Sequence, residues 1–132
     1  MKIMIMDGQG GGVGRSLVEE LRAAYPEADL IAVGTNATAT ANMMKGGTTS
    51  GATGENAVVY NSGRVDVIVG PIGIVMANAM LGEITPKMAE AVASSEARIL
   101  LIPMSRCNAA VMGVEGRKLS DYVKEAVEKV GI

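Results

Sequence analysis

Four short apolar runs, separated by polar and glycine-rich stretches, set the pattern of the chain. They cover residues 3–6, 30–33, 65–69 and 99–102. Apolar runs that do not alternate with polar residues indicate strands buried on both faces, as in a parallel sheet. We therefore expect about five parallel strands, of which these runs locate four.

Helical periodicity lies between these runs. Apolar residues recur every three to four positions over 13–24, which predicts a first helix. Thr85-Pro86 predicts an N-cap followed by proline at the first helical position, in a helix that continues to about residue 94. A final amphipathic helix is expected over 119–130, with Ser120 as its cap.

The middle of the chain is less regular. Residues 37–45 predict a small helix, and 55–62 another with Thr53 as its cap. Residues 57–60 can equally be a strand, but helix is favoured because the next strand begins only at residue 65. The apolar stretch 67–82 predicts a buried strand, a turn and a buried helix, and its glycines and proline make it unlike a membrane span.

Strands that alternate with helices predict an α/β fold with right-handed crossovers. The length of 132 residues suits one domain. We expect a single three-layer Rossmann-like domain over residues 1–132. Its site should lie where the strands end, since the glycines cluster there.

Composition excludes several classes of function. The chain has no histidine and one cysteine, which excludes histidine-based catalysis, an internal disulfide and a cysteine zinc site. Twelve basic and fourteen acidic residues give a net charge of −2, and tryptophan and phenylalanine are absent, so nucleic acid is an unsuitable partner. The opening residues lack the apolar length of a signal peptide, so a cytoplasmic location is expected.

The strongest functional signal is the glycine loop after the first strand. Asp7-Gly8-Gln9-Gly10-Gly11-Gly12-Val13-Gly14 joins that strand to the first helix. Its Gly8-x-x-x-Gly12-x-Gly14 spacing resembles the phosphate loop of the short-chain dehydrogenase/reductase family. Glycines in this position permit close backbone approach to a phosphate at a helix N-terminus. Close helix–strand packing is the alternative explanation.

The resemblance to the reductases ends at the loop. Their catalytic tyrosine and lysine lie four residues apart, whereas here Tyr25, Tyr60 and Tyr122 have no lysine at that spacing. The loop alone predicts cofactor binding through Gly8, Gln9, Gly10, Gly11, Gly12, Val13 and Gly14. No metal site is expected.

The end of the second strand bears on which nucleotide is bound. Many NAD sites have an acidic residue there, but this chain has Thr35-Asn36. These neutral groups can hydrogen-bond a ribose or its 2′-phosphate, or they can form a helix cap and turn. NADP or NAD is therefore the expected cofactor, with NADP slightly favoured, while FAD, coenzyme A and simpler phosphate ligands stay open.

Further candidates follow the later strands. The backbone of Gly70, Pro71 and Ile72 is expected to line the cofactor, or else to form a tight turn. Glu83 is a candidate for acid–base chemistry, and its alternative role is to complement the helix that opens at Pro86. Cys107 is a second weak catalytic candidate, against a buried inert thiol. Substrate contacts are expected from these residues: Asn78, Arg106 and Asn108.

The whole chain also resembles a bacterial family catalogued as domain of unknown function 3842. The matching pieces include the glycine loop, Gly34-Thr35-Asn36, Gly70-Pro71-Ile72-Gly73 and Arg106-Cys107-Asn108. The resemblance implies a bacterial cytoplasmic origin and no particular activity.

Three functional hypotheses follow from these features. The first is a nucleotide-binding domain that acts as a sensor or as a subunit without its own chemistry. The second is a minimal oligomeric oxidoreductase whose pocket a neighbouring subunit completes. The third is a protein that binds coenzyme A, a phosphorylated metabolite or a protein partner. A homo-oligomer, dimeric or tetrameric, is expected because residues 70–82 are apolar and small.

Overall fold

A computed structural model describes residues 1–103, 109–114 and 116–131. Its elements alternate along the chain. In order they are β1 (Lys2–Asp7), α1 (Gly12–Ala24), β2 (Asp29–Gly34), α2 (Ala37–Met44), β3 (Ser50–Thr53), α3 (Glu55–Ser62), β4 (Val67–Pro71), the 3₁₀ helix η1 (Ile72–Val75), α4 (Pro86–Ala93), β5 (Arg98–Ile102) and α5 (Leu119–Val130).

All five strands are parallel and form one sheet in the order β3-β2-β1-β4-β5. The order in which the chain adds strands to the sheet reverses between β1 and β4. The chain first adds β2 and β3 on one side of β1, and then adds β4 and β5 on the other side. In open α/β sheets, ligands bind at this switch point, outside the carboxyl ends of the strands. The expected α/β fold with a five-stranded parallel sheet is confirmed.

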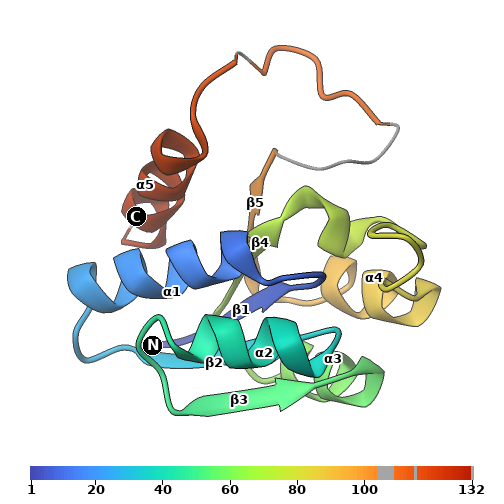
Figure 1. Ribbon diagram of the computed structural model, residues 1–132, viewed down its shortest axis with the longest axis horizontal. Coiled ribbons are helices and arrows are strands. Elements are labelled where there is room, and N and C mark those ends of the chain that lie inside the picture. Colours follow the sequence, from blue (N-terminus) through green and yellow to red (C-terminus); the bar gives the residue numbers. More distant parts are fainter. Residues whose placement is uncertain (104–108, 115, 132) are drawn as a thin grey trace.

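Helices cover both faces of the sheet, as Figure 1 shows. On one face α1 packs against α2 and α5, and on the other α3 packs against α4. Alternate residues of β1 point to opposite sides. Ile3 and Ile5 contact the core under α1 and α5, whereas Met4 and Met6 contact the core under α3 and α4. This two-sided burial explains why the strands are continuous apolar runs.

Most sequence-based element predictions are confirmed, including the helix over 55–62 and the N-cap at Thr85, whose hydroxyl accepts a hydrogen bond from the Met88 amide. Two predicted caps are wrong. The N-cap of α3 is Gly54, because Thr53 is the last residue of β3. The N-cap of α5 is Lys118 rather than Ser120, which lies inside the first turn of the helix.

The segment after β4 differs from its prediction. Gly70 and Pro71 belong to β4 itself, and the expected buried helix is replaced by η1 and an irregular connection. We call residues 76–85 of this connection the strap. Three of its residues, Asn78, Met80 and Leu81, have φ values of 67°, 57° and 57°. Left-handed backbone in non-glycine residues ends a right-handed helix, so the apolar pattern here did not produce one.

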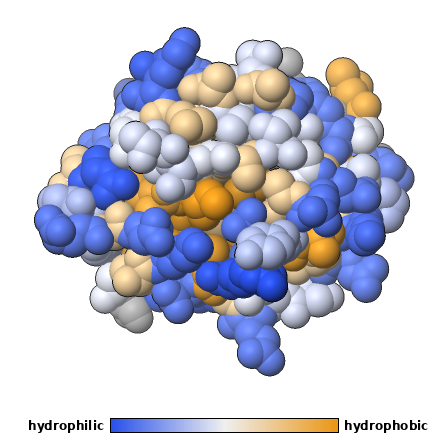
Figure 2. Space-filling view, turned by 90° about the horizontal axis from the view of Figure 1, so that it is seen from below, coloured by the Kyte–Doolittle hydropathy of each residue, from blue (hydrophilic) through white to orange (hydrophobic). Residues whose placement is uncertain are grey.

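The two edge strands of the sheet differ in character. The β3 edge has the sequence SGAT. Figure 2, which views the molecule from below Figure 1, shows a central apolar area bordered by hydrophilic side chains. The β5 edge has the sequence RILLI, with Leu101 at 36% exposure. Among the described residues, no helix is long and apolar enough to cross a membrane.

Gly70 shows how closely β4 approaches β1. A methyl group at this position would overlap the Met6 carbonyl oxygen in the neighbouring strand. We expect Gly70→Ala to lower the free energy of unfolding by about 1–3 kcal/mol, the usual cost of overpacking a buried site. Gly63→Ala is the matched control, since no atom lies within 4 Å of a methyl group there. Urea unfolding measures both, and equal stability of the two variants would contradict the close approach.

Candidate functional site

The turn between β1 and α1 is organised around the Asp7 carboxylate. Asp7 is only 5% exposed. Its Oδ1 accepts a hydrogen bond from the Gly8 amide at 2.7 Å, and its Oδ2 accepts one from the Gly14 amide at 2.8 Å. Gly14 is in the first turn of α1, where amides lack intrahelical partners and the helix dipole favours a negative charge. Asp7 therefore supplies, from inside the protein, a hydrogen-bond acceptor for an amide in the first turn of α1.

Burial has an electrostatic consequence for Asp7. Desolvation raises the pKa of the Asp7 carboxyl above its ordinary value of 3.8, and the charge of Glu83 adds to the increase. Hydrogen bonds from the Gly14 and Gly8 amides oppose the change without cancelling it. The turn thus holds two carboxylates, one inside the protein and one at its surface.

The second carboxylate, Glu83, comes from the strap. Its Oε1 accepts three hydrogen bonds, from the Gln9 amide at 2.9 Å, the Thr35 hydroxyl at 2.6 Å and the Asn36 side-chain amide at 2.8 Å. These donors follow β1 and β2. Desolvation raises the pKa of Glu83, but the three hydrogen bonds together outweigh it and hold the pKa below its ordinary value of 4.5. Glu83 is therefore a fixed anion at the carboxyl edge of the sheet.

Thr35 and Asn36 thus lie beside the glycine loop, and their cofactor-binding role stays a prediction. Asn36 is also the helix cap that was the alternative explanation. Its Oδ1 accepts the Ala39 amide at the start of α2, while its Nδ2 donates to the Gln9 carbonyl oxygen and to Glu83. The acidic residue expected in NAD sites at the end of the second strand is absent from β2. A carboxylate reaches the same place from the strap.

The glycines of the loop divide into two groups. A methyl group on Gly11 would lie 2.7 Å from a backbone oxygen of α2, and one on Gly8 would lie 2.6 Å from the Thr35 hydroxyl oxygen. One on Gly14 would overlap a methionine side chain of α2. These three glycines are explained by packing. Gly10 and Gly12 face open space, with nothing within 4 Å of an added methyl group, so packing does not require them.

The open part of the loop carries free donors. Within the part of the chain that the structure describes, the amides of Gly10, Gly12 and Val13 donate no hydrogen bond. Arg15 lies one helical turn beyond Gly12. Its guanidinium donates to the Asn42 side-chain oxygen at 2.9 Å, and Asn42 in turn donates to the Gly10 carbonyl oxygen at 3.0 Å. Unpaired amides at a helix N-terminus are the kind of donor that an anion uses, because the helix dipole adds to their attraction for negative charge.

The strap also reaches the end of the sheet at which β1 and β4 are neighbours. The Met80 side chain lies close to both Gly8, in the loop after β1, and Gly73, in η1. Figure 1 shows the loop after β1, in blue, and the strap, in yellow-green, at the same end of the sheet. The half-buried Met80 side chain therefore lies between the segments that follow β1 and β4.

The remaining predicted residues are distributed more widely. Gly70 and Pro71 are buried in β4, and Ile72 begins η1 directly after it. Asn78 is exposed and forms a turn of the strap, in which its carbonyl oxygen accepts the Gly82 amide. Arg106, Cys107 and Asn108 lie outside the described residues. The cofactor, substrate and catalytic roles of all these residues stay predictions. Among the described residues, no group of acidic side chains or cysteines is arranged to hold a metal ion.

Sequence reasoning missed four parts of the site: Asp7, Arg15, Asn42 and Met80. Asp7 alone had a recognisable signal, since a carboxylate between a buried strand and a glycine loop is suited to cap the following helix. The others depend on contacts between distant segments. Arg15 and Asn42 are 27 residues apart in the chain, and most of the strands of the sheet lie between Gly8 and Met80 in the sequence.

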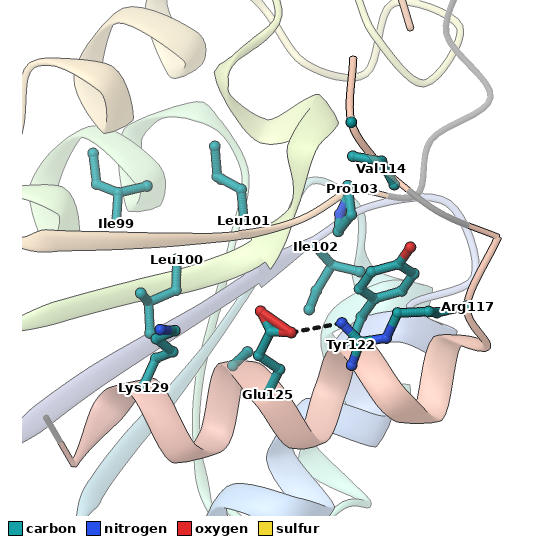
Figure 3. Close-up of a pocket in the computed structure, with 12 residues that line it drawn as sticks. Ile99, Leu100, Leu101, Ile102, Pro103, Val114, Arg117, Tyr122, Glu125 and Lys129 are labelled. Carbon is teal, nitrogen blue, oxygen red and sulfur yellow. Dashed lines mark hydrogen bonds and ion pairs between the residues drawn. The ribbon is translucent and has the colours of Figure 1, made fainter. Parts of the chain in front are cut away.

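A groove of about 460 Å³ lies away from the glycine loop, between β5 and α5. Figure 3 shows Leu100 and Ile102 pointing toward α5, with Ile99 and Leu101 pointing to the other face of the sheet. The Arg117 guanidinium donates to Glu125 at 2.6 Å, and this hydrogen bond lowers the pKa of the Glu125 carboxyl. The groove is apolar along β5 and charged along α5.

Comparisons with known proteins identify the family and the fold. The family model described as domain of unknown function (DUF3842) matches residues 2–131, so the chain belongs to that family. No curated protein matches it. A crystal structure of a dodecameric FMN-dependent UbiX-like decarboxylase from Escherichia coli O157:H7 is similar with a TM-score of 0.50 and 18% identity, over 100% of this chain and 77% of that chain. This likeness supports the Rossmann-like fold.

The prediction of NADP or NAD is wrong by this comparison, because the solved structure with the same fold is described as FMN-dependent. The loop geometry offers a physical reason. The amides of Gly8 and Gly14 already donate to Asp7 and that of Gln9 to Glu83, so these three loop donors are not available to a pyrophosphate. The neutral residues Thr35 and Asn36, on which NADP was preferred, likewise donate to Glu83.

The contacts of Glu83 predict a pH-dependent contribution to stability. We expect Glu83→Gln to lower the free energy of unfolding at pH 7 by about 1 kcal/mol, since charge-assisted hydrogen bonds become neutral ones at a partly exposed site. A folded-state pKa below the unfolded value of 4.5 means that this contribution is present above pH 4.5 and is lost as the pH falls through the folded-state pKa.

Urea unfolding of both proteins between pH 3 and pH 7 measures the difference. Glu90→Gln on α4 is the control, because the Glu90 side chain is exposed and has no hydrogen-bond partner among the described residues. A difference between wild type and Glu83→Gln that stays constant across this range would contradict the assignment.

Proposed function

We propose that this member of the DUF3842 family binds a phosphorylated flavin of the FMN type at the glycine loop, as a ligand-binding domain. The observation that carries the proposal is the set of amides at Gly10, Gly12 and Val13, which donate no hydrogen bond to any described residue, at the N-terminus of α1 where Gly10 and Gly12 face open space. A terminal monophosphate needs only one such cluster of donors. The FMN-dependent description of the solved structure with this fold supports the choice of ligand.

The residues around the loop fit such a ligand. The phosphate would be held by the free amides, with Arg15 supplying charge from the adjacent turn of α1. The less polar part of the ligand would lie toward the strap, where Met80 and the fully exposed Leu81 provide apolar surface. A bound flavin supplies one- and two-electron transfer, and the chain's residues would bind and orient it.

The loop assignment predicts a charge-specific loss of binding. Gly12→Asp places a carboxylate beside the three free amides, and we expect it to weaken FMN binding at least a hundredfold, because the new charge takes the phosphate position. The substitution should not unfold the protein, since Gly12 faces open space and a carboxylate at a helix N-terminus is favourable.

Quenching of flavin fluorescence on titration with protein measures FMN binding, and thermal unfolding checks the fold. Gly12→Ala is the matched control, because it adds bulk in the same open space without charge. We expect this variant to bind FMN within about threefold of wild type. Equal FMN affinity of the Asp variant and wild type would disprove the phosphate site.

We also propose that the chain forms a homo-oligomer through the β5 edge. A parallel-sheet edge that exposes apolar side chains is an unprotected pairing surface. Leu101 is 36% exposed on this edge, and the β5–α5 groove adjoins it. The dodecameric assembly of the solved structure with the same fold is consistent with self-association.

Leu101→Lys tests this surface. A charged residue on an exposed edge blocks pairing, so we expect the variant to run as a monomer at concentrations where wild type is oligomeric. Size-exclusion chromatography with light scattering, or native mass spectrometry, reports the mass directly. Tyr60→Lys on α3 is the control, since Tyr60 is 55% exposed away from β5. A wild-type monomer would exclude the oligomer altogether.

A further inference from the structure

We propose that two copies of this chain exchange an apolar turn across a two-fold axis, and that each copy inserts Met112 into the β5–α5 groove of the other. The inference rests on the proposed homo-oligomer. It names the partner of the β5 edge as a second copy, and it names the residues that reach that copy. It does not depend on any ligand at the glycine loop.

The segment that leads toward α5 contains a turn with exposed apolar side chains. Residues 109–114 have the sequence AAVMGV, without a polar side chain. The Val114 amide donates to the Val111 carbonyl oxygen at 3.5 Å and closes the turn, and we call residues 111–114 the apolar turn. Its tip, Met112, is 82% exposed. Turns at a protein surface are usually built from glycine, proline and polar residues, so this one offers an unusual contact surface.

The apolar turn is part of a larger apolar face. Seven large apolar residues are exposed among the described residues, and four of them belong to β5 or to the turn: Leu101, Val111, Met112 and Val114. Val114 and Leu101 also line the same groove between β5 and α5. The turn, the groove and the β5 edge are therefore neighbours. Exposed apolar residues that gather on one face mark an interaction surface.

The open edge of β5 determines how a second copy can add to the sheet. Among the described strands, β5 pairs with β4 alone. The Arg98 amide donates toward β4, to the Asp66 carbonyl oxygen, and backbone groups alternate in direction along a strand. The amides and carbonyls of Ile99 and Leu101 therefore face the open edge. Two identical strands that pair about a two-fold axis run antiparallel, so a second β5 would add to this edge in that direction.

An antiparallel second copy brings the apolar turn of one chain to the far end of the other chain's groove. Figure 3 shows that α5 runs opposite to β5, with Val114 and Pro103 at one end of the groove and Lys129 at the other. A two-fold axis through the middle of the groove exchanges these ends. Met112 of each copy then lies over the Lys129 end of its partner, where Leu100 points toward α5.

The charges of the groove suit an uncharged occupant. The Arg117 guanidinium and the Glu125 carboxylate lie 2.6 Å apart and pair with each other, so neither needs a charge from an incoming segment. Lys129 is exposed, and its aliphatic part can cover a methionine while its amine stays in water. Methionine in turn adapts to irregular apolar surfaces. The apolar turn, which carries no charge, thus complements the groove of another copy.

The exchange has to be reciprocal to reach the size of a stable interface. One turn with three large apolar side chains covers only a few hundred Å². A standard interface buries about 800 Å² on each partner. A two-fold arrangement uses both turns, both grooves and both β5 edges at once, because each copy carries the turn beside the groove. A different protein would use each of these surfaces only once, which favours a second copy as the occupant.

Met112→Asp tests the apolar turn. An unpaired carboxylate in an apolar groove is costly, so we expect the dissociation constant of the oligomer to rise at least about a hundredfold. Met112→Leu is the matched control and should dissociate as wild type does, since leucine is apolar and of similar volume. Met112 is exposed in the single chain, so neither substitution should disturb the fold. Size-exclusion chromatography with light scattering over a concentration series measures the dissociation.

Cross-linking between copies tests where the turn lies. In a Cys107→Ser background, one protein carries Met112→Cys and a second, tagged protein carries Lys129→Cys, so a short bismaleimide joins these two cysteines only between chains. After subunit exchange, we expect at least about fivefold more linked mixed dimer than with Lys124→Cys as the second protein, because proximity raises the effective concentration. Lys124 is the control, since it is exposed on α5 but does not line the groove.

The outcomes separate this inference from the proposed oligomer. If Leu101→Lys dissociates the oligomer while Met112→Asp leaves its mass unchanged, the exchanged turn is wrong and the β5 edge stays. If Lys129→Cys and Lys124→Cys give equal yields of linked dimer, the insertion into the groove is wrong even where Met112→Asp dissociates the oligomer. A wild-type monomer at every concentration overturns both proposals. Dissociation by Met112→Asp together with preferential linking to Lys129→Cys supports the exchange.

Discussion

The backbone amides at the turn from β1 into α1 are the constraint on which the carboxyl edge of the sheet depends. A strand that leads directly into a helix leaves first-turn N–H groups without intrahelical partners, so they are open to acceptors from elsewhere. Two carboxylates accept hydrogen bonds from amides of this turn. Asp7 accepts those of the Gly8 and Gly14 amides, and Glu83 accepts that of the Gln9 amide. The hydrogen bonds to Asp7 require a buried carboxylate, and the one to Glu83 requires a strap long enough to cross the carboxyl edge of the sheet.

The fold was predictable where burial is two-sided and dense in apolar residues. The four predicted strands lie in the sheet, and all the predicted helices outside 67–82 are present, because continuous apolar runs and 3.6-residue periodicity report burial directly. β3 was not located, since Ser50–Thr53 is a partly exposed edge with no large apolar side chain. The helix expected within 67–82 failed for a different reason: Met80 and Leu81 have left-handed backbone that no apolar pattern reveals.

The site was predictable only in its local part. The glycine loop and Thr35-Asn36, which the structure brings side by side, were singled out because glycines and small polar residues at strand ends are typical of ligand sites. The contacts of Glu83 were not predicted, because the residues that donate to it lie 47, 48 and 74 positions earlier in the chain. Sequence reasoning associated Glu83 with the helix that opens at Pro86. The structure connects it instead to the loops after β1 and β2, so a missing acid on β2 was replaced by one from the strap.

The charges around this turn would oppose one another if an anion were bound there. Two unit charges 4 Å apart repel by about 4 kcal/mol at an effective dielectric constant of 20. A phosphate on Gly10 and Gly12 would face Glu83 on one side and the buried Asp7 on the other. Arg15 brings an opposing charge, but it is shared with Glu19, which its guanidinium contacts at 2.9 Å. Glu83 accepts the Gln9 amide, whereas the amides of Gly10 and Gly12 have no acceptor among the described residues, so a bound anion and the Glu83 carboxylate would use different donors of one short turn and would repel each other.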